Sequence, residues 1–509
     1  MSNDNLYAVL EQGFPTDRSA VAIETPDLEY TWDDLDKSSA RMANLLASLN
    51  LPAGSRVAVQ VEKSPEALLL YLATIRAGLV YLPLNTAYRE SEIEYFLGDA
   101  EPAVVVCSGG NVEWVQRVAD KAGTAHVYTL NDDRTGTLLD AAASQSDAFA
   151  TIERSADDLA AILYTSGTTG RSKGAMLSHG NLSSNAQVLH RYWGWSSDDV
   201  LLHMLPIFHV HGLFVASHGA LLAGARMIWL PRLDIEAALR YLPRCTMMMG
   251  VPTYYVRLLA DSRFDRQLCA NMRLFISGSA PLLTETFDSF RERTGHTILE
   301  RYGMSETVML TSNPYASADG ERCGGTVGMA LPGVSVRVAD DEGRVLGANE
   351  IGHVQVKGPN VFAGYWRMPE KTREEFTADG WFRTGDVGQF GGHDVPDNYL
   401  TIVGRSKDLI ISGGYNVYPK EIELVIDTLP GVNESAVIGV PHPDFGEAVV
   451  AVVVPRPGQE LDADQMLETL KQHLANFKVP KRIHFVQELT RNTMGKVQKN
   501  ALREQYKTL

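Results

Sequence analysis

A loop of glycine, hydroxyl and lysine side chains is the segment that most directly indicates chemistry. Residues 164–174, Tyr-Thr-Ser-Gly-Thr-Thr-Gly-Arg-Ser-Lys-Gly, follow an apolar run that predicts a β-strand. Glycine lets the backbone approach a ligand closely, and successive backbone N–H groups in such a loop form an anion cradle. The hydroxyl groups add hydrogen-bond donors, and Lys173 adds a mobile positive charge. The loop therefore predicts a polyphosphate-binding site.

The order of residues separates this loop from a Walker A loop. A Walker A loop has glycine directly before Lys-Ser/Thr, whereas Ser172 precedes Lys173 here and Gly174 follows it. The alternative is an ordinary surface turn rich in glycine and serine. The complete eleven-residue string favours phosphate binding over that alternative.

Length and composition are typical of an enzyme with several domains. The chain has 509 residues, too many for one core, and 45% of them are hydrophobic. The formal net charge of −16 disfavours nucleic acid and anionic membranes as partners. No apolar run has the roughly 18 residues of a membrane helix, and the first residues lack the features of a signal peptide. The four cysteines show no zinc-type spacing and suit a reducing compartment, so we expect a cytoplasmic protein.

The elements that must position the loop follow an α/β pattern. Strand-like and helical segments alternate to about residue 300, which predicts parallel or mixed sheets with helices. Short alternating runs between about 320 and 400 predict a small antiparallel β unit. A polar Gly-Arg-Ser-Lys-Asp step at 404–408 indicates a boundary, followed by a separate α+β pattern. We therefore predict a large N-terminal domain, 1–404, and a small mobile C-terminal domain, 405–509.

Several further strings lie in order along the chain and carry a family resemblance. They are Thr165–Gly174, 301–306 (Arg-Tyr-Gly-Met-Ser-Glu), 381–386 (Trp-Phe-Arg-Thr-Gly-Asp), 404–408, 413–423 (Gly-Gly-Tyr-Asn-Val-Tyr-Pro-Lys-Glu-Ile-Glu) and 492–496 (Asn-Thr-Met-Gly-Lys). With these strings the chain resembles the adenylate-forming superfamily of acyl-CoA synthetases, luciferases and peptide-synthetase adenylation domains, from about residue 20 to 505. Within it, the chain looks most similar to malonyl-CoA synthetases.

The resemblance implies an AMP-forming acid–thiol ligase that works in two steps. A carboxylate attacks the α-phosphorus of ATP, with Mg²⁺ as the metal, and releases pyrophosphate. The thiol of coenzyme A then attacks the acyl carbon of the acyl-adenylate, and AMP leaves. Attack on phosphorus needs positive charge around the reacting centre rather than a covalent protein nucleophile.

The resemblance also assigns the ATP site residue by residue. Glu306 is the expected Mg²⁺ ligand, because a hard cation prefers carboxylate oxygen. Tyr302 is expected beside adenine, and Asp386 is expected to accept hydrogen bonds from the ribose. Ser305 stands where most relatives have threonine, and it keeps the hydroxyl group. The complete expected set is Thr165, Ser166, Gly167, Thr168, Thr169, Gly170, Lys173, Ser277, Gly278, Ser279, Ala280, Glu300, Arg301, Tyr302, Gly303, Met304, Ser305, Glu306, Asp386, Arg405 and Lys496.

Lys496 is the expected catalytic lysine of the first step. By resemblance it places an ammonium group between the substrate carboxylate and the α-phosphate, together with Glu306 and Thr165. The small domain is then expected to swing about Lys407, which withdraws Lys496 and brings Ser412, Gly413, Gly414 and Tyr415 to coenzyme A. Acetylation would remove the charge of Lys496, so the resemblance also implies an acetyltransferase and a deacetylase as partners.

Two arginines in apolar surroundings suggest the acid that is activated. Arg257 lies in an apolar helical stretch, and Arg301 precedes Tyr302 where many relatives carry a small residue. Arginine is rarely buried without a partner. The resemblance to malonyl-CoA synthetases implies that both guanidinium groups face inward and bind a distal carboxylate, together with Ser279 and His209.

A pocket with two guanidinium groups favours a short dicarboxylate. A planar guanidinium holds a carboxylate through two charge-assisted hydrogen bonds, whereas a fatty acid would leave it desolvated and unpaired. One extra methyl group changes binding by only about 1–3 kcal/mol, so the prediction covers malonate and methylmalonate alike.

Other functions stay open at this point. The chain is alternatively a CoA ligase for another short or medium carboxylic acid, or an adenylation enzyme that loads a carrier protein. The sequence shows no carrier domain with its serine motif, which weighs against the latter. A non-catalytic nucleotide sensor would not need Glu306, Lys173 and Lys496 together. We expect a monomer or a weak homo-oligomer.

Overall fold

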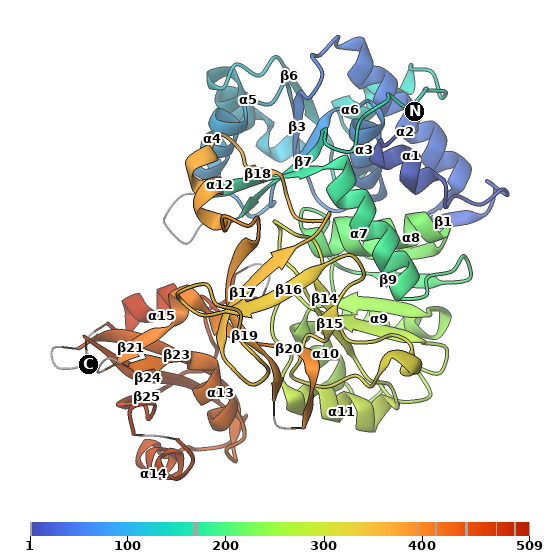
Figure 1. The fold of residues 1–509 in the computed structure, drawn as a ribbon. Coiled ribbons are helices and arrows are strands. Elements are labelled where there is room, and N and C mark those ends of the chain that lie inside the picture. Colours follow the sequence, from blue (N-terminus) through green and yellow to red (C-terminus); the bar gives the residue numbers. More distant parts are fainter. Residues whose placement is uncertain are drawn as a thin grey trace. The chain divides into compact units, whose positions relative to one another are not determined.

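The computed structural model describes residues 3–165, 172–392, 394–412, 415–442, 446–474, 476–492 and 495–507. The chain forms two compact units (Figure 1). Unit 1 comprises Met1–Ser335 and Lys357–Phe382, and unit 2 comprises Val336–Val356 and Arg383–Leu509. Each unit is described by itself.

Unit 1 is built on mixed β-sheets whose central strands are parallel, as predicted. One sheet has the order β15 (Met329–Ala330), β14 (Thr311–Ser312), β13 (Leu299–Tyr302), β12 (Leu274–Ser277), β11 (Met247–Gly250), β9 (Val200–His203), β10 (Arg226–Trp229), β1 (Val21–Glu24) and β2 (Glu29–Thr31). Another has the order β18 (Gly364–Tyr365), β8 (Lys173–Ser178), β7 (Leu159–Thr165), β4 (Val80–Pro83), β3 (Arg56–Gln60), β5 (Val104–Cys107) and β6 (His126–Thr129). Their interior strands are buried, which fits the apolar runs in the sequence.

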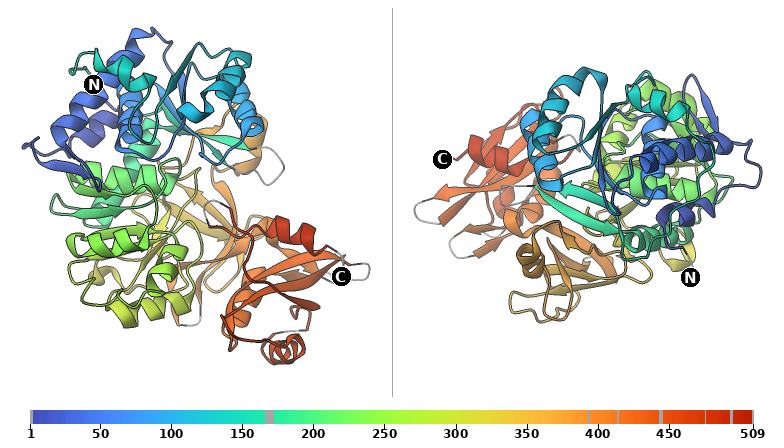
Figure 2. Two further views of the ribbon diagram at one scale, coloured as in Figure 1. Left: turned by 180° about the vertical axis from the view of Figure 1, so that it is seen from behind. Right: turned by 90° about the horizontal axis from the view of Figure 1, so that it is seen from above.

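Helices cover both faces of these sheets (Figures 1 and 2). They are α1 (Leu6–Glu11), α2 (Trp32–Ser48), α3 (Pro65–Arg76), α4 (Glu90–Ala100), α5 (Val112–Lys121), α6 (Thr137–Ala143), α7 (His179–Tyr192), α8 (His218–Ala223), α9 (Ile235–Tyr241), α10 (Pro252–Leu259), α11 (Thr284–Thr294) and α12 (Pro369–Glu375), with a π-helix, η2 (His211–Ser217). Short 3₁₀ turns lie at η1 (Gly109–Asn111), η3 (Leu242–Arg244) and η4 (Ser317–Asp319). In the part of the chain that the structure describes, no helix is both long and apolar enough to cross a membrane.

Local sequence signals explain where these helices begin. Thr31 caps α2 and forms a capping box with Asp34, whose carboxylate accepts the Thr31 backbone N–H at 2.8 Å. Ser64 accepts the Ala67 N–H at 3.1 Å at the start of α3, where Pro65 occupies the first helical turn. Both helices therefore begin at residues whose side chains cap the first turn.

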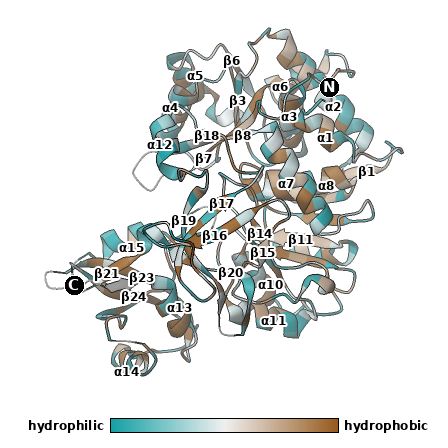
Figure 3. Cartoon of the chain, viewed as in Figure 1, coloured by the Kyte–Doolittle hydropathy of each residue, from teal (hydrophilic) through white to brown (hydrophobic). Residues whose placement is uncertain are grey.

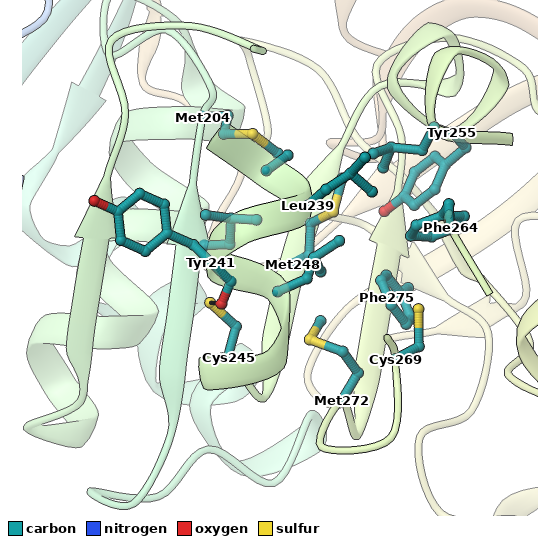
Figure 4. Packing of buried hydrophobic residues seen from close by; sticks show 14 of the residues in the cluster. Met204, Leu239, Tyr241, Cys245, Met248, Tyr255, Phe264, Cys269, Met272 and Phe275 are labelled. Carbon is teal, nitrogen blue, oxygen red and sulfur yellow. Dashed lines mark hydrogen bonds between the residues drawn. The ribbon is translucent and has the colours of Figure 1, made fainter. Parts of the chain in front are cut away.

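An aromatic and methionine-rich core supports the sheet that carries β11 and β12 (Figure 4). Phe275 of β12 packs edge-on against Phe290 of α11, with 4.9 Å between ring centroids. Tyr255 of α10 donates a hydrogen bond to the Ile276 carbonyl at 2.6 Å. This bond fixes α10 to β12 directly before the strand ends. Hydrophobic residues gather on the strands and polar residues on the outer helix faces (Figure 3).

Unit 2 contains the predicted small β unit as a sheet of its own. Its strands have the order β16 (Ser335–Ala339), β17 (Gly352–Lys357), β19 (Phe382–Gly392) and β20 (Val395–Arg405). β19 and β20 form a long antiparallel hairpin. Because this pairing continues to the end of β20, the predicted boundary at 404/405 lies inside unit 2. The contacts therefore group the β unit with the C-terminal segment, and the division into 1–404 and 405–509 stays a prediction.

The C-terminal segment of unit 2 is α+β, as predicted. Its strands are β22 (Tyr415–Val417), β21 (Ile410–Ser412), β24 (Gly446–Pro455), β23 (Val432–His442) and β25 (Arg482–Phe485). Its helices are α13 (Pro419–Asp427), α14 (Ala463–His473) and α15 (Lys499–Gln505), with a 3₁₀ turn η5 (Ser406–Asp408). The β23–β24 hairpin forms the centre, and apolar residues of α13 and α14 pack against it.

A half-buried carboxyl group gives this segment a pH-dependent stability. Burial raises the pKa of Asp427 to about 6, although Ser435 donates a hydrogen bond to it at 2.7 Å. The folded state therefore binds this proton more tightly than the unfolded state, and stability falls as pH rises from about 4 through 6. Asp427→Asn is expected to be more stable than wild type above pH 6, by roughly 1–3 kcal/mol. Denaturant unfolding at pH 5 and pH 8 checks this, and an equal difference at both values would contradict it.

Candidate active site

The carboxyl ends of parallel strands bring two predicted segments side by side in unit 1. Ser277 ends β12 and is paired in register with Glu300 of β13 and with Gly250 of β11. Ligands of open α/β sheets bind outside the carboxyl ends of such strands. The segments 277–280 and 300–306 therefore meet at the edge where a substrate site is expected.

Arg301 is a buried cation with unused hydrogen-bond donors. Its relative exposure is 2%, and within the described residues its Nε and Nη2 groups have no hydrogen-bond partner. Removal from water lowers the pKa of this guanidinium to about 9, although Tyr255 and Glu300 act in the opposite direction. Unpaired buried donors are costly for the free protein. An anion that accepts these two N–H groups would remove that cost.

Ser279 and His211 lie in contact beside this region. The Ser279 hydroxyl is 3.3 Å from His211 Nδ1, and Ser279 has a left-handed backbone with φ of 72°. Such a conformation is uncommon outside glycine and often marks a functional site. Burial lowers the pKa of His211 well below its usual value, and the charge of Arg301 lowers it further. His211 is therefore a neutral imidazole close to a guanidinium.

Gly278 allows the guanidinium group to occupy its position. A Cβ atom on Gly278 would lie 2.5 Å from Arg301 Nη1, far inside van der Waals contact. Arg301 is buried and cannot simply turn into solvent. We expect Gly278→Ala to displace it and to raise KM for the acid substrate about tenfold, with a smaller change in KM for ATP. Steady-state pyrophosphate release checks this, and equal changes in the two KM values would contradict it.

The two arginines expected to bind the distal carboxylate differ in burial: Arg301 is buried and Arg257 is exposed, and the role of each stays a prediction. Arg257 is exposed on α10, whereas Tyr255 and Leu258 of the same helix are buried. Successive helix residues are turned by about 100°, so a residue between two buried positions can lie on the outer face. The apolar stretch around Arg257 is thus one side of an amphipathic helix.

A second histidine, His211, contacts Ser279, while the expected role of His209 in the acid pocket stays a prediction. His209 is half-buried and lies before the π-helix, while His211 is the first residue of η2 and is buried. The sequence placed both in one His-Val-His string and offered no periodicity to separate them. A π-helix has more residues per turn than an α-helix, so its side chains point in other directions than α-helical periodicity gives. No sequence signal predicted the π-helix.

Glu306 and Lys173 are linked through Tyr365. The Tyr365 hydroxyl donates to Glu306 Oε1 at 3.0 Å, and Lys173 Nζ lies 4.0 Å from the centre of its ring. Lys173 also pairs with Glu375 of α12 at 3.3 Å. Lys173 and Glu306 are both buried. Tyr365 and Glu375 were not predicted, because they are far from both residues in sequence and belong to no recognised string.

The remaining ATP residues of unit 1 follow the same strands. Thr165 ends β7, and its hydroxyl lies 3.4 Å from the Lys173 carbonyl. Tyr302 ends β13, and a Cβ on Gly303 would lie 1.8 Å from the Val308 carbonyl, so the turn after β13 requires glycine. Met304, Ser305 and Ala280 are half-buried, and Glu300 is buried. The loop residues Ser166, Gly167, Thr168, Thr169 and Gly170 lie outside the described residues.

Unit 2 pairs two of the predicted nucleotide residues. Asp386 of β19 and Arg405 of β20 are register partners, and Arg405 Nε donates to Asp386 Oδ1 at 2.7 Å. Asp386 is buried, and its backbone N–H donates to Thr384 Oγ1 at 3.1 Å. Lys407 follows in η5, where burial lowers its pKa. The pair orients a carboxylate within a rigid hairpin.

A tight turn presents Lys496 at the surface of unit 2. Arg491 and Val497 form a β-bridge, and the Asn492 side chain accepts the Lys496 backbone N–H at 2.9 Å. Gly495 has φ of 75°, which a residue with a side chain rarely adopts. Lys496 itself is exposed.

The predicted CoA residues belong to the same unit. Ser412 is buried at the end of β21, and Tyr415 begins β22. Gly413 and Gly414 lie outside the described residues. The roles assigned to the site residues of both units stay predictions.

The chain belongs to the AMP-binding enzymes. That family matches residues 10–366, and the family described as the AMP-binding enzyme C-terminal domain matches residues 421–496. The resemblance to the adenylate-forming superfamily, and with it the predicted fold class, is confirmed.

Several known proteins are similar to this chain over nearly its full length. The chain is 32% identical to the malonate–CoA ligase of Arabidopsis thaliana, over 95% of this chain and 86% of the relative. It is 34% identical to the feruloyl-CoA synthase of an Amycolatopsis species, over 96% of each chain. The crystal structure of ATP-bound MatB from Rhodopseudomonas palustris superposes with a TM-score of 0.96, at 56% identity over 99% of each chain.

Proposed function

We propose that this enzyme ligates malonate, and with it methylmalonate, to coenzyme A with ATP, through an acyl-adenylate. The observation that carries the choice of acid is the buried Arg301 with two unused N–H donors beside Ser279 and His211. A bidentate carboxylate accepts both donors of one guanidinium edge. Similarity to a malonate–CoA ligase supports the same choice.

In the first step, one carboxylate of the diacid attacks the α-phosphorus and pyrophosphate leaves. Lys173 and Thr165 are proposed to bind the phosphates, Tyr302 the adenine, and Lys496 the reacting groups. In the second step the CoA sulfur bonds to the acyl carbon, the thiol proton is released, and AMP leaves with the bond electrons. The distal carboxylate stays with Arg301 throughout.

Glu306 is the residue that would hold Mg²⁺. Within the described residues no group of three or more histidine, cysteine or carboxylate side chains could hold a metal alone. Mg²⁺ is often held by one or two carboxylates together with substrate phosphates, so a single buried glutamate fits it. The ion would supply charge neutralisation on the phosphates.

The proposed role of Lys496 suggests how the enzyme is regulated. We propose that a lysine acetyltransferase and a deacetylase act on Lys496, whose exposure on a turn suits modification. Acetylation would remove the ammonium group and stop adenylation. A cytoplasmic location and a monomeric or weakly associating state are the proposals that accompany this activity.

A panel of carboxylic acids tests the proposed function. AMP formation that depends on both ATP and CoA is expected with malonate and methylmalonate, and at least 100-fold less with acetate, butyrate and ferulate. Butyrate is the matched control, because it lacks the distal carboxylate. Similarity to a feruloyl-CoA synthase makes an aromatic acid the second candidate substrate. A preference for ferulate over malonate would show that the aromatic acid is the substrate.

A further inference from the structure

A half-buried lysine outside every motif places its ammonium group at the carboxyl ends of three strands in unit 1. Lys63 follows β3, and its ammonium group lies 2.9 Å from His203 Nδ1, 2.9 Å from the His203 carbonyl and 2.7 Å from the Leu230 carbonyl. His203 ends β9, and Leu230 follows β10. Lys63 therefore joins one sheet of unit 1 to the other.

The three contacts match an ammonium group. Lysine in its charged form has three donors and no acceptor, and three acceptors surround it. Trp229 adds its ring face at 4.4 Å from the Lys63 Nζ. Lys63 as a residue is half-buried, yet removal of its head group from water lowers its pKa well below the usual value. These partners offset part of that penalty.

The contact between Lys63 and His203 links two hydrogen positions. An ammonium group at Lys63 can only donate, so it requires His203 Nδ1 to accept and Nε2 to carry the hydrogen. Nε2 lies 3.0 Å from the Gly212 carbonyl and 3.1 Å from Ser217 Oγ, so it donates toward the π-helix. Burial and the charge of Lys63 lower the pKa of His203 well below its usual value, consistent with a neutral ring.

The first turn of η2 is thus held from two sides. Gly212 and Ser217 are both in η2, and the Ser217 hydroxyl donates to the Gly212 carbonyl at 2.9 Å. On the other side, a Cβ on Gly212 would lie 2.1 Å from the Pro206 carbonyl. A shift of this turn would move its neighbour His211, which contacts Ser279.

We propose that Lys63, acting through His203, is a positioning residue for the acid pocket. It holds the first turn of η2 and thereby keeps His211 against Ser279, next to Arg301. The inference rests on the proposed function, because it assigns the acid to the region of these three residues. Lys63 touches no reacting atom in this assignment.

The test separates positioning from general stability. Lys63→Met is expected to raise KM for malonate about tenfold and to change KM for ATP less than twofold. Arg154→Met is the matched control. Arg154 donates to the Gly78 carbonyl at 2.7 Å, at the amino end of β4, whereas Lys63 lies at the carboxyl ends of the strands. Arg154→Met is expected to lower the melting temperature as much as Lys63→Met does, without altering KM for malonate.

Ser217→Ala provides a milder variant should Lys63→Met fail to fold. It removes one donor to the Gly212 carbonyl and keeps the His203 ring, and a two- to fivefold rise in KM for malonate alone is expected. Equal changes in the KM values for malonate and ATP, or effects of Lys63→Met that match those of Arg154→Met, would overturn the proposal. Preference of the wild-type enzyme for another acid would refute the proposed function instead, and the Lys63 comparison would then use that acid.

Discussion

Arg301→Leu is expected to lower kcat/KM for malonate by about 10³–10⁴-fold while butyrate turnover does not fall. Without the guanidinium, the distal carboxylate of malonate would enter a buried site with no partner, which costs several kcal/mol. Butyrate has no distal carboxylate, so it loses no interaction when Arg301 is replaced. Pyrophosphate release with each acid, at saturating ATP, measures the difference.

The melting temperature distinguishes this loss from damage to the fold. Arg301 is buried with two unused donors, so leucine should leave the stability of the free protein unchanged or increase it. Arg301→Lys is the companion variant, because it keeps the charge and loses the planar fork, and it should retain part of the malonate activity. Full malonate turnover by a folded Arg301→Leu enzyme would exclude Arg301 as the carboxylate ligand.

Arg257→Leu is the informative comparison. Arg257 is exposed, so solvent screens its charge, and its replacement should cost less than tenfold in malonate kcat/KM. A loss as large as that of Arg301→Leu would support the expectation of two carboxylate-binding arginines.

Lys496→Ala is expected to abolish adenylation, by about 10³-fold or more, and to leave thioester formation from supplied malonyl-AMP within a few-fold of wild type. The ammonium group is needed where negative charges on the carboxylate and the phosphate approach each other. Once the adenylate exists, that repulsion has been overcome. Pyrophosphate release reports the first half-reaction, and malonyl-CoA formation from malonyl-AMP and CoA reports the second.

Lys471→Ala is the control for this prediction. Lys471 is an exposed lysine of the same unit, paired with Glu468 on α14, and its loss should change neither half-reaction. If Lys496→Ala slows both half-reactions equally, the proposal that Lys496 acts in the first step alone is wrong.

The sequence was sufficient to predict structural features that depend on neighbouring residues alone. The Thr31–Asp34 capping box, the strand before the phosphate loop and the α+β C-terminal segment needed only neighbouring residues, and the structure has all three. Burial of Arg301 was also expected, because the family resemblance implied that its guanidinium group faces inward.

The sequence was insufficient to predict features that depend on contacts between residues far apart in the chain. Arg257 lies in an apolar stretch but on the exposed side of α10, which only the partner elements of that helix determine. Likewise, Lys63 and Leu230 are 167 residues apart, and no pattern links them. The β19–β20 hairpin crosses the predicted boundary at 404/405. The pairing of its two strands continues to Arg405, within the polar sequence that suggested a break.

The π-helix has a consequence for how this enzyme can diversify. A seven-residue stretch in that conformation contains more residues per turn than the α-helix that continues it as α8. Deleting one residue between His211 and Ser217 would convert the wide turn to an ordinary one and shift His211 relative to α8. Loss of a single codon would thus move His211 against Ser279 without a change at Arg301, so the length of this segment is a second way, besides substitution, to alter the proposed acid pocket.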